Sequence, residues 1–214
     1  MKNHNHHISM KKILFLLFVL IPACGVAQNQ DLSKYMAGAV TLNEAGYVSF
    51  KKHYDVKDKS KGEIYHLLKN YAISDIVGGE NSLPQARIQD ADSLGGLVVA
   101  GMEEYLYFKR TAWTNHRVRF YYQLIFNAAD GGFDVEMRNL RYIYDDMTEP
   151  QTYRAEEWIT DEAALNKTKT KLLKTPGKFR RFTIDRKNEI FRGAAAATGV
   201  EPKYKVVKVI SDED

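Results

Sequence analysis

The sequence predicts an α+β fold in which helices cover one face of an antiparallel β-sheet. Segments rich in Val, Ile, Tyr and Phe are grouped between residues 86 and 144, and helical patterns stand before and after them. In the last of these segments apolar and charged residues alternate, so one face is buried and the other is solvated. The alternating residues are Phe133, Val135 and Met137 against Asp134, Glu136 and Arg138. A strand with one wet face indicates an antiparallel sheet that is covered on one side.

The first elements are a pair of strands and a helix. Residues 39–42 and 47–56 have strand character on either side of a turn-forming stretch. Ser60 and Glu63 then form a capping-box pattern, which predicts the start of a helix. Apolar residues at helical spacing continue from there toward Gly78, where the helix should stop.

Four further strands should follow this helix. Their residues are 86–91, 96–108, 117–127 and 133–144. The last two are separated by Asp130-Gly131-Gly132, which is typical of a β-hairpin turn.

After Pro150 the pattern becomes helical again. The signal is weak over residues 155–165 and strong from Pro176 to Gly199, where large apolar residues and alanines recur on one face. Residues 204–210 are expected to add an edge strand before an acidic tail. The predicted organisation is therefore a single domain over residues 28–200, followed by a C-terminal strand and tail over residues 201–214.

We expect residues 1–27 to be a signal peptide. Met10 and the lysines that follow it supply a positive start, and Ile13 begins an apolar run of nine residues, which is too short to span a bilayer. Small residues at Gly25 and Ala27 predict cleavage before Gln28. Met10 is an alternative start of translation. As a second alternative, the residues around Cys24 are similar to a bacterial lipobox, which would make the protein an outer-membrane lipoprotein.

Removal of residues 1–27 changes the composition. Loss of Lys2, Lys11 and Lys12 leaves 28 of the 31 basic residues against 27 acidic ones, so the mature charge is near neutral. A near-neutral protein has no overall field that attracts a polyanion, which argues against nucleic-acid binding. Removal of Cys24 leaves no thiol, which excludes disulfides, cysteine nucleophiles and thiolate metal sites.

Several segments carry a family resemblance. They are residues 48–56, Ser60 with Ile64-Tyr65, residues 156–162, residues 165–167, and residues 178–185. Together they resemble a domain of unknown function with a TATA-binding-protein-like (TBP-like) fold, found in exported proteins of Gram-negative gut and environmental bacteria. The resemblance implies a curved antiparallel sheet with helices packed on one face. It implies no activity, because the family has none assigned.

The candidate catalytic groups are few. The chain lacks the serine-hydrolase, zincin, P-loop and dinucleotide-binding motifs. His53, His66 and His116 are far apart, and we expect each to lie on the surface or half-buried. Paired acids occur at Glu103-Glu104, Asp145-Asp146 and Glu156-Glu157. Neighbours on a strand point to opposite faces, so the two members of a pair cannot act together in catalysis. We therefore expect solvated positions for these acids. We predict no catalytic residue, no metal ligand and no cofactor.

A basic strip is the strongest candidate for binding. Residues 167–192 contain ten Lys or Arg and two acidic residues, whereas residues 28–166 contain 15 basic and 21 acidic ones. Alternating lysines at its start suggest an extended register. The strip can hold a phosphate-bearing partner, or it can pair with the acidic part of its own domain. The candidate binding residues are Lys167, Lys169, Lys171, Lys178, Arg180 and Arg181, together with Trp158, which either stacks on a carbohydrate or anchors the core.

These observations favour a periplasmic or secreted, non-enzymatic module that binds or assembles with an envelope component. The expected partner is an anionic glycan, a lipid head group or a protein, with membrane association only if Cys24 is lipidated. Two alternatives stay open. One is an envelope-glycan hydrolase that uses acidic residues from separate strands, and the other is a structural subunit that pairs through a sheet edge.

Overall fold

The computed structural model describes residues 31–110, 115–144 and 150–200. From Leu32 onward these residues belong to one compact unit. The expected signal peptide, Cys24, the Asp145-Asp146 pair and the expected strand over residues 204–210 lie outside the described residues. No helix within the described ranges is both long enough and apolar enough to cross a bilayer.

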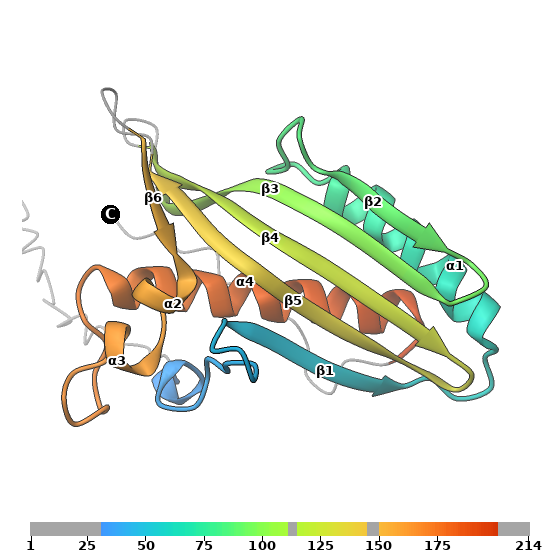
Figure 1. The fold of residues 1–214 in the computed structure, drawn as a ribbon, viewed down its shortest axis with the longest axis horizontal. Helices are drawn as coiled ribbons and strands as arrows, with labels where there is room; N and C mark the ends of the chain where they lie inside the picture. Colours follow the sequence, from blue (N-terminus) through green and yellow to red (C-terminus); the bar gives the residue numbers. More distant parts are fainter. Residues whose placement is uncertain (1–30, 111–114, 145–149, 201–214) are drawn as a thin grey trace, which may run out of the picture. The chain divides into compact units, whose positions relative to one another are not determined.

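Six strands form one antiparallel sheet (Figure 1). The strand order is β1-β5-β4-β3-β2, and β6 pairs with β5 outside this path. Their bounds are β1 (Ser49–Asp55), β2 (Arg87–Asp92), β3 (Leu97–Arg110), β4 (Asn115–Ala129), β5 (Gly132–Tyr144) and β6 (Gln151–Arg154). The predicted antiparallel sheet is confirmed, and β3, β4 and β5 form its long central meander.

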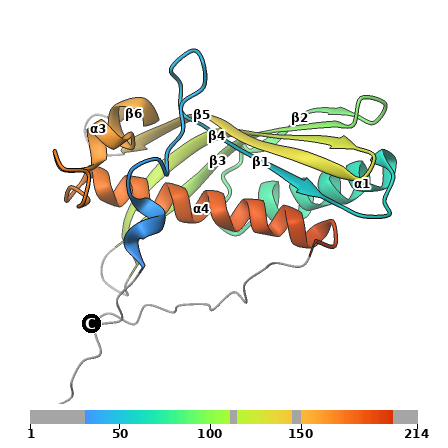
Figure 2. The same ribbon diagram turned by 90° about the horizontal axis from the view of Figure 1, so that it is seen from below.

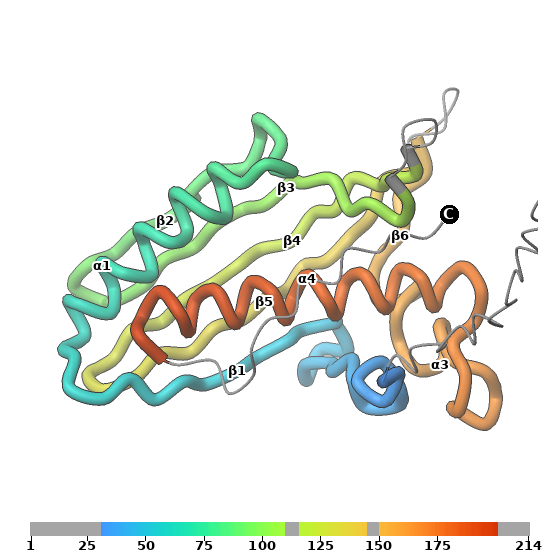
Figure 3. The backbone as a smooth tube through the Cα atoms, turned by 180° about the vertical axis from the view of Figure 1, so that it is seen from behind, coloured from blue at the N-terminus to red at the C-terminus, as the bar shows by residue number. Residues whose placement is uncertain are grey.

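Two long helices lie on the same face of this sheet, as Figures 2 and 3 show from below and from behind. They are α1 (Lys61–Tyr71), which contacts β3 and β4, and α4 (Pro176–Ala197), which contacts β1 and β3. The shorter elements are η1 (Leu32–Tyr35), the π-helical η2 (Ala72–Val77), α2 (Ala155–Trp158) and α3 (Asp161–Ala164). The predicted fold class, helices on one face of an antiparallel sheet, is therefore confirmed.

Local sequence signals explain several element boundaries. Helix α1 begins at the predicted capping box, in which the Glu63 carboxylate accepts from the Ser60 backbone N–H at 2.8 Å. The hairpin between β4 and β5 turns at Gly131, whose φ of +77° is a conformation that glycine adopts without steric cost. Helix α4 starts with Pro176, where a missing N–H breaks no helical hydrogen bond.

The core lies between the sheet and the two helices. Phe133, Val135 and Met137 of β5 are buried there, and Asp134 is exposed, as their alternation predicts. Aromatic rings of the central strands pack against each other and against α4; the Phe120 and Tyr142 rings stack 5.2 Å apart. Burial of these apolar side chains drives the helices onto this face of the sheet.

Three features differ from the sequence-based expectations. The expected strand over residues 39–42 is reduced to a single bridge between Leu42 and Val48. The expected helix over residues 155–165 is divided into α2 and α3, because Thr160 caps a new turn by accepting from the Ala163 backbone N–H. The short strand β6 precedes them and was not predicted.

Both members of the Glu103-Glu104 pair are buried, so the expected solvated position is wrong for each. They point to opposite faces of β3, as neighbours on a strand must. Glu104 is 1% exposed and forms a bidentate pair with Arg186 of α4 at 2.7 and 2.8 Å. The Tyr122 hydroxyl also donates to Glu104 at 3.1 Å. This buried ionic contact ties α4 to the middle of the sheet.

Candidate functional site

The basic strip predicted from sequence does not form one surface. Lys167, Lys169 and Lys171 lie in the loop between α3 and α4, and their expected extended register is wrong. Lys169 has a φ of +55°, and the Asn166 side chain closes the loop by accepting from the Lys171 backbone N–H at 3.1 Å. Lys169 also pairs with Glu162 at 2.9 Å, which neutralises part of the loop's charge.

Arg180 is a buried anchor. Its side chain is 0% exposed, and it donates to the carbonyls of Tyr35 at 2.6 Å, Met36 at 2.6 Å and Ile159 at 2.7 Å. It also pairs with Asp161 at 2.7 Å. Burial acts to raise the pKa of the Asp161 carboxyl, but the hydrogen bonds from the Gly38 backbone N–H and from Arg180 outweigh it and lower the pKa. The guanidinium therefore joins η1, α3 and α4, and its donors face the protein interior.

The remaining two candidate binding residues of the strip lie at the start of α4. Lys178 is exposed, and Arg181 is half-buried with its guanidinium 5.6 Å from the centre of the Tyr35 ring. Their role in binding stays a prediction, as it does for the lysines of the loop.

Trp158 is half-buried between β6 and α4. Its ring centre lies 4.4 Å from that of Tyr153 and 4.8 Å from that of Phe179. These contacts fit the interpretation of Trp158 as an anchor of the core. Carbohydrate stacking on its ring stays a prediction.

His53, His66 and His116 are exposed and lie on different elements. His53 is on β1, His66 on α1 and His116 on β4. Hydrogen bonding to Asp134, at 2.8 Å, is the main cause that raises the pKa of His53. In the part of the chain that the structure describes, no cluster of three His, Cys, Asp or Glu side chains has a metal-binding arrangement.

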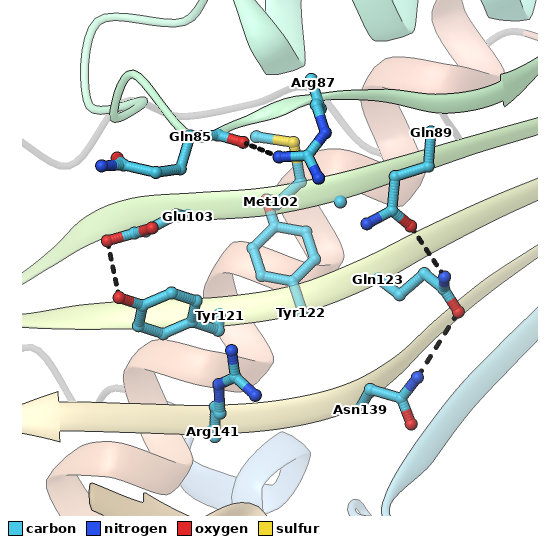
Figure 4. A pocket seen from close by; sticks show the side chains of 11 residues that line it. Gln85, Arg87, Gln89, Met102, Glu103, Tyr121, Tyr122, Gln123, Asn139 and Arg141 are labelled. Carbon is cyan, nitrogen blue, oxygen red and sulfur yellow. Dashed lines mark hydrogen bonds between the residues drawn. The ribbon is translucent and has the colours of Figure 1, made fainter.

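A polar depression lies on the sheet face opposite α1 and α4 (Figure 4). It has a volume of about 310 Å³ and extends across β2, β3, β4 and β5. Side chains with amide, guanidinium, phenol and carboxylate groups line it. The sequence pattern did not indicate this surface, because its residues come from four separate strands.

Two β-bulges direct amide side chains into the depression. Gln89 is the extra residue where the register of β2 shifts between Ile88 and Asp90. Asn139 is placed similarly in β5, and its φ of +57° is one that asparagine adopts more readily than most residues. Bulges change the direction of a side chain and are frequent next to functional sites. Here they bring both amides toward Gln123 of the central strand β4.

Gln123 joins these amides into a ladder (Figure 4). It donates to the Gln89 side-chain oxygen at 2.9 Å. Its own oxygen accepts from Arg138 Nε at 2.9 Å and from the Asn139 amide at 3.4 Å. The ladder therefore presents a row of ordered donors and acceptors across three strands.

Gly101 makes room for this ladder. A Cβ atom at Gly101 would lie 2.1 Å from the Gln89 side-chain nitrogen, so any larger residue displaces that amide. Gly101 pairs with Gln123 in the sheet, and it forms the floor of the depression beneath Gln89.

The other end of the depression contains a buried carboxylate. Glu103 is 6% exposed and accepts from the Tyr121 hydroxyl at 2.6 Å, and Arg119 lies 3.6 Å away. Burial and the hydrogen bond to Glu103 raise the pKa of Tyr121, so the phenol stays protonated. The guanidinium of Arg141 stacks 4.6 Å from the centre of the Tyr121 ring.

The depression has a net positive character. Arg87 and Arg141 line it together with a single carboxylate, Glu103. No carboxylate within the described ranges lies at salt-bridge distance from Arg87 or Arg141. Arg87 donates one hydrogen bond, to the Gln85 carbonyl at 3.3 Å. Guanidinium groups next to ordered amides suit a ligand that carries hydroxyl groups and a carboxylate or phosphate.

The comparisons with known proteins concern the same region. The model of a domain of unknown function (DUF4468) with TBP-like fold matches residues 50–143, which span β1 to β5. A crystal structure of a DUF4468 family protein from Bacteroides ovatus is 31% identical, with a TM-score of 0.73; the match covers 82% of this chain and 99% of that one. A TBP-like protein from Parabacteroides distasonis is 19% identical, with a TM-score of 0.58, over 73% of this chain and 95% of that one. No curated protein matched.

Proposed function

This chain belongs to the DUF4468 family of domains with a TBP-like fold, and from its geometry we propose that it is a non-enzymatic binding module of the cell envelope. Its ligand is an anionic glycan, which binds to the open face of the sheet. The observation that carries this proposal is the amide ladder of Gln89, Gln123 and Asn139. It lies beside two arginines that no carboxylate of the described residues neutralises.

The chemistry of the depression supports a saccharide as the ligand. Sugar hydroxyl groups both donate and accept, and amides present both functions in one plane. Arg87 and Arg141 can receive the carboxylate or phosphate of an acidic sugar through paired N–H donors. The open shape of the depression suits a segment of a polymer rather than a small molecule that must be enclosed.

The hydrolase alternative has less support from this surface. Hydrolysis of a glycosidic bond in most such enzymes requires two carboxyl groups that face each other at about 5 to 9.5 Å. Glu103 is the one carboxylate among the residues that line the depression, and its oxygen is already held by Tyr121.

The edge-pairing alternative also has less support. Lys51, Lys52 and His53 occupy the middle of β1, which lies at one end of the main strand order. Charged side chains on an edge strand hinder the addition of a further strand.

The binding proposal can be tested by titrating ¹⁵N-labelled protein with tri-galacturonate, using neutral maltotriose as the comparison. We expect tri-galacturonate to shift the side-chain amide signals of Gln89, Gln123 and Asn139, and maltotriose to bind at least about tenfold more weakly because it lacks charge. Gly101→Ala should weaken binding, because its new methyl group displaces Gln89 without reaching the core.

Lys178→Met is the matched control, since Lys178 is exposed at the start of α4 and does not line the depression. It should bind as the unaltered protein does. If Lys178→Met weakened tri-galacturonate binding as much as Gly101→Ala, the site would instead lie on the basic strip. Binding that Gly101→Ala leaves unchanged would contradict the use of the open sheet face.

Export is part of the same proposal, because an envelope ligand requires passage out of the cytoplasm. The signal-peptide pattern of residues 1–27 supports it. Intact mass spectrometry of the protein from its native envelope fraction tests the assignment. A mass that begins at Gln28 is expected; acylation on Cys24 would instead make the protein a tethered lipoprotein, and an uncut chain would contradict export.

A further inference from the structure

A second cavity lies along the outer edge of the sheet, where β1 and α4 run side by side (Figure 3). This edge groove has a volume of about 850 Å³, within the range of small-molecule sites. It lies away from the amide ladder and shares no lining residue with the depression on the open face.

The floor of the edge groove is apolar. Phe50 of β1 and Phe191 and Ala195 of α4 line it, and each is at most 4% exposed. These side chains are supported by the core beneath them, so the floor is preformed. An apolar portion of a ligand that covered this floor would leave water at little cost to the protein.

Of the lysines and arginines that line the groove, Lys34 and Lys51 pair with Asp185 and Glu136, and three others surround the floor. Lys187 is half-buried, and its ammonium lies 5.3 Å from the centre of the Phe50 ring and 5.7 Å from that of Phe191. Lys52 and Arg192 are exposed at the rim. Over residues 31–110, 115–144 and 150–200, no carboxylate lies at salt-bridge distance from any of the three.

The nearby acids are engaged elsewhere. Asp185, two residues before Lys187, pairs with Lys34 at 2.8 Å and accepts from the Tyr35 hydroxyl at 2.7 Å. Asp55, which lines the groove at the far end of β1, pairs with His53 at 3.4 Å. Burial, aided by the like charges of Lys52 and Arg192, lowers the pKa of Lys187 to about 8, and the charge of Asp185 offsets this only in part. A bound anion would supply the missing counter-charge.

We propose that the edge groove is a binding site for a small amphipathic anion, with its phosphate or carboxylate head on Lys187, Lys52 and Arg192 and its apolar body on Phe50 and Phe191. The ligand is a free molecule rather than a membrane surface, because the ammonium of Lys187 lies within the groove and between two elements. This inference is independent of the open face and of glycan binding there.

Octyl phosphate is a suitable probe for the full-length mature protein, measured by isothermal titration calorimetry at pH 6.5. Two comparison compounds separate the parts of the ligand: inorganic phosphate has the charge alone, and octyl glucoside has the apolar chain alone. We expect each of them to bind at least about tenfold more weakly than octyl phosphate, because each uses one half of the groove. Equal binding of either compound would overturn the proposal.

Substitutions then locate the site. Lys187→Met and Lys52→Met should each weaken octyl phosphate binding by about tenfold or more, whereas Lys178→Met on the exposed start of α4 should not change it. Methionine retains most of the length of the lysine side chain and removes its charge, so the groove largely retains its shape. Unchanged affinity in both groove variants would overturn the proposal.

Three further readouts exclude other occupants. NMR titration of the Lys187 side chain should show its pKa rising when octyl phosphate is bound, which a merely structural role would not produce. Phosphatidylglycerol vesicles should not bind the protein; binding to vesicles without binding to octyl phosphate would identify a membrane instead. A triple variant, Asp212→Asn with Glu213→Gln and Asp214→Asn, should keep the same affinity. Binding about tenfold tighter in that variant would identify the chain's own acidic end as the occupant and overturn the proposal.

Discussion

Replacement of Lys187 by Met should stabilise the folded protein at neutral pH. Lys187 has a pKa of about 8 in the folded protein against 10.5 for an ordinary lysine, mainly because the side chain is half-buried. The unfolded chain therefore holds this proton more firmly than the folded one. At pH 7 the lysine is charged in both states, and the folded state carries the cost of that charge.

The magnitude follows from the difference between the two pKa values. At about 1.4 kcal/mol per pKa unit, the charge costs the folded state roughly 3.5 kcal/mol at most. The side chain keeps some contact with water, and methionine forgoes the contacts of the ammonium with the Phe50 and Phe191 rings. We therefore expect a net gain on the order of 1 to 2 kcal/mol in the free energy of unfolding.

Urea denaturation followed by tryptophan fluorescence at pH 7, 8.5 and 10 measures this gain. The stability advantage of Lys187→Met should shrink as pH rises. Between pH 8 and 10.5 the folded protein releases the proton while the unfolded chain still holds it, so the cost of the buried charge falls progressively. Lys178→Met, at an exposed position, should stay within about 0.5 kcal/mol of the unaltered protein throughout. A loss of stability in Lys187→Met at pH 7, or a gain that is equal at pH 7 and pH 10, would refute the reasoning.

Three more substitutions test buried and capping contacts by the same urea assay. Arg180→Lys should cost about 3 kcal/mol, since one ammonium cannot replace the fork of donors that holds three carbonyls and a carboxylate; recovery of full stability would contradict the anchoring role. Glu104→Gln should cost about 3 kcal/mol because it leaves the Arg186 guanidinium without its bidentate partner, and a joint replacement of both by leucine should cost less. Ser60→Ala should lower the free energy of unfolding by about 1 kcal/mol, because α1 loses its N-cap. An unchanged free energy of unfolding would indicate that the start of α1 frays independently of the sheet.

The parts of the fold that were predicted from sequence depend on neighbouring residues. The capping box at Ser60, the turn at Gly131 and the alternation along β5 each involve contacts within a few positions of the chain. The family resemblance is confirmed as well, and with it the TBP-like fold. Strand β6 was missed because it has four residues and pairs with the end of β5, so its conformation depends on where that strand finishes.

The buried ionic contacts and the proposed binding surfaces were missed because they depend on distant contacts. Arg180 has the sequence context of a surface cation, yet its burial results from carbonyls of η1, about 145 positions earlier. Glu104 is buried because Arg186 reaches it across 82 positions. The amide ladder depends on two bulges, and a bulge shifts the pattern of a strand by one residue. Glutamine at mid-strand positions, at Gln89 and Gln123, was the signal that could have pointed to the open face.

The edge groove also has a consequence for the order in which the protein folds. Its two walls come from opposite ends of the described chain, β1 at Ser49–Asp55 and α4 at Pro176–Ala197, with the whole meander of β3, β4 and β5 between them. The meander closes through short hairpins, and pairings of low sequence separation form fastest. The docking of β1 on β5 joins Ser49 to Arg138, and closure of so long a loop carries a larger entropic cost. The edge groove should therefore be among the last features to assemble, so that a ligand of this groove would bind only chains that have completed folding.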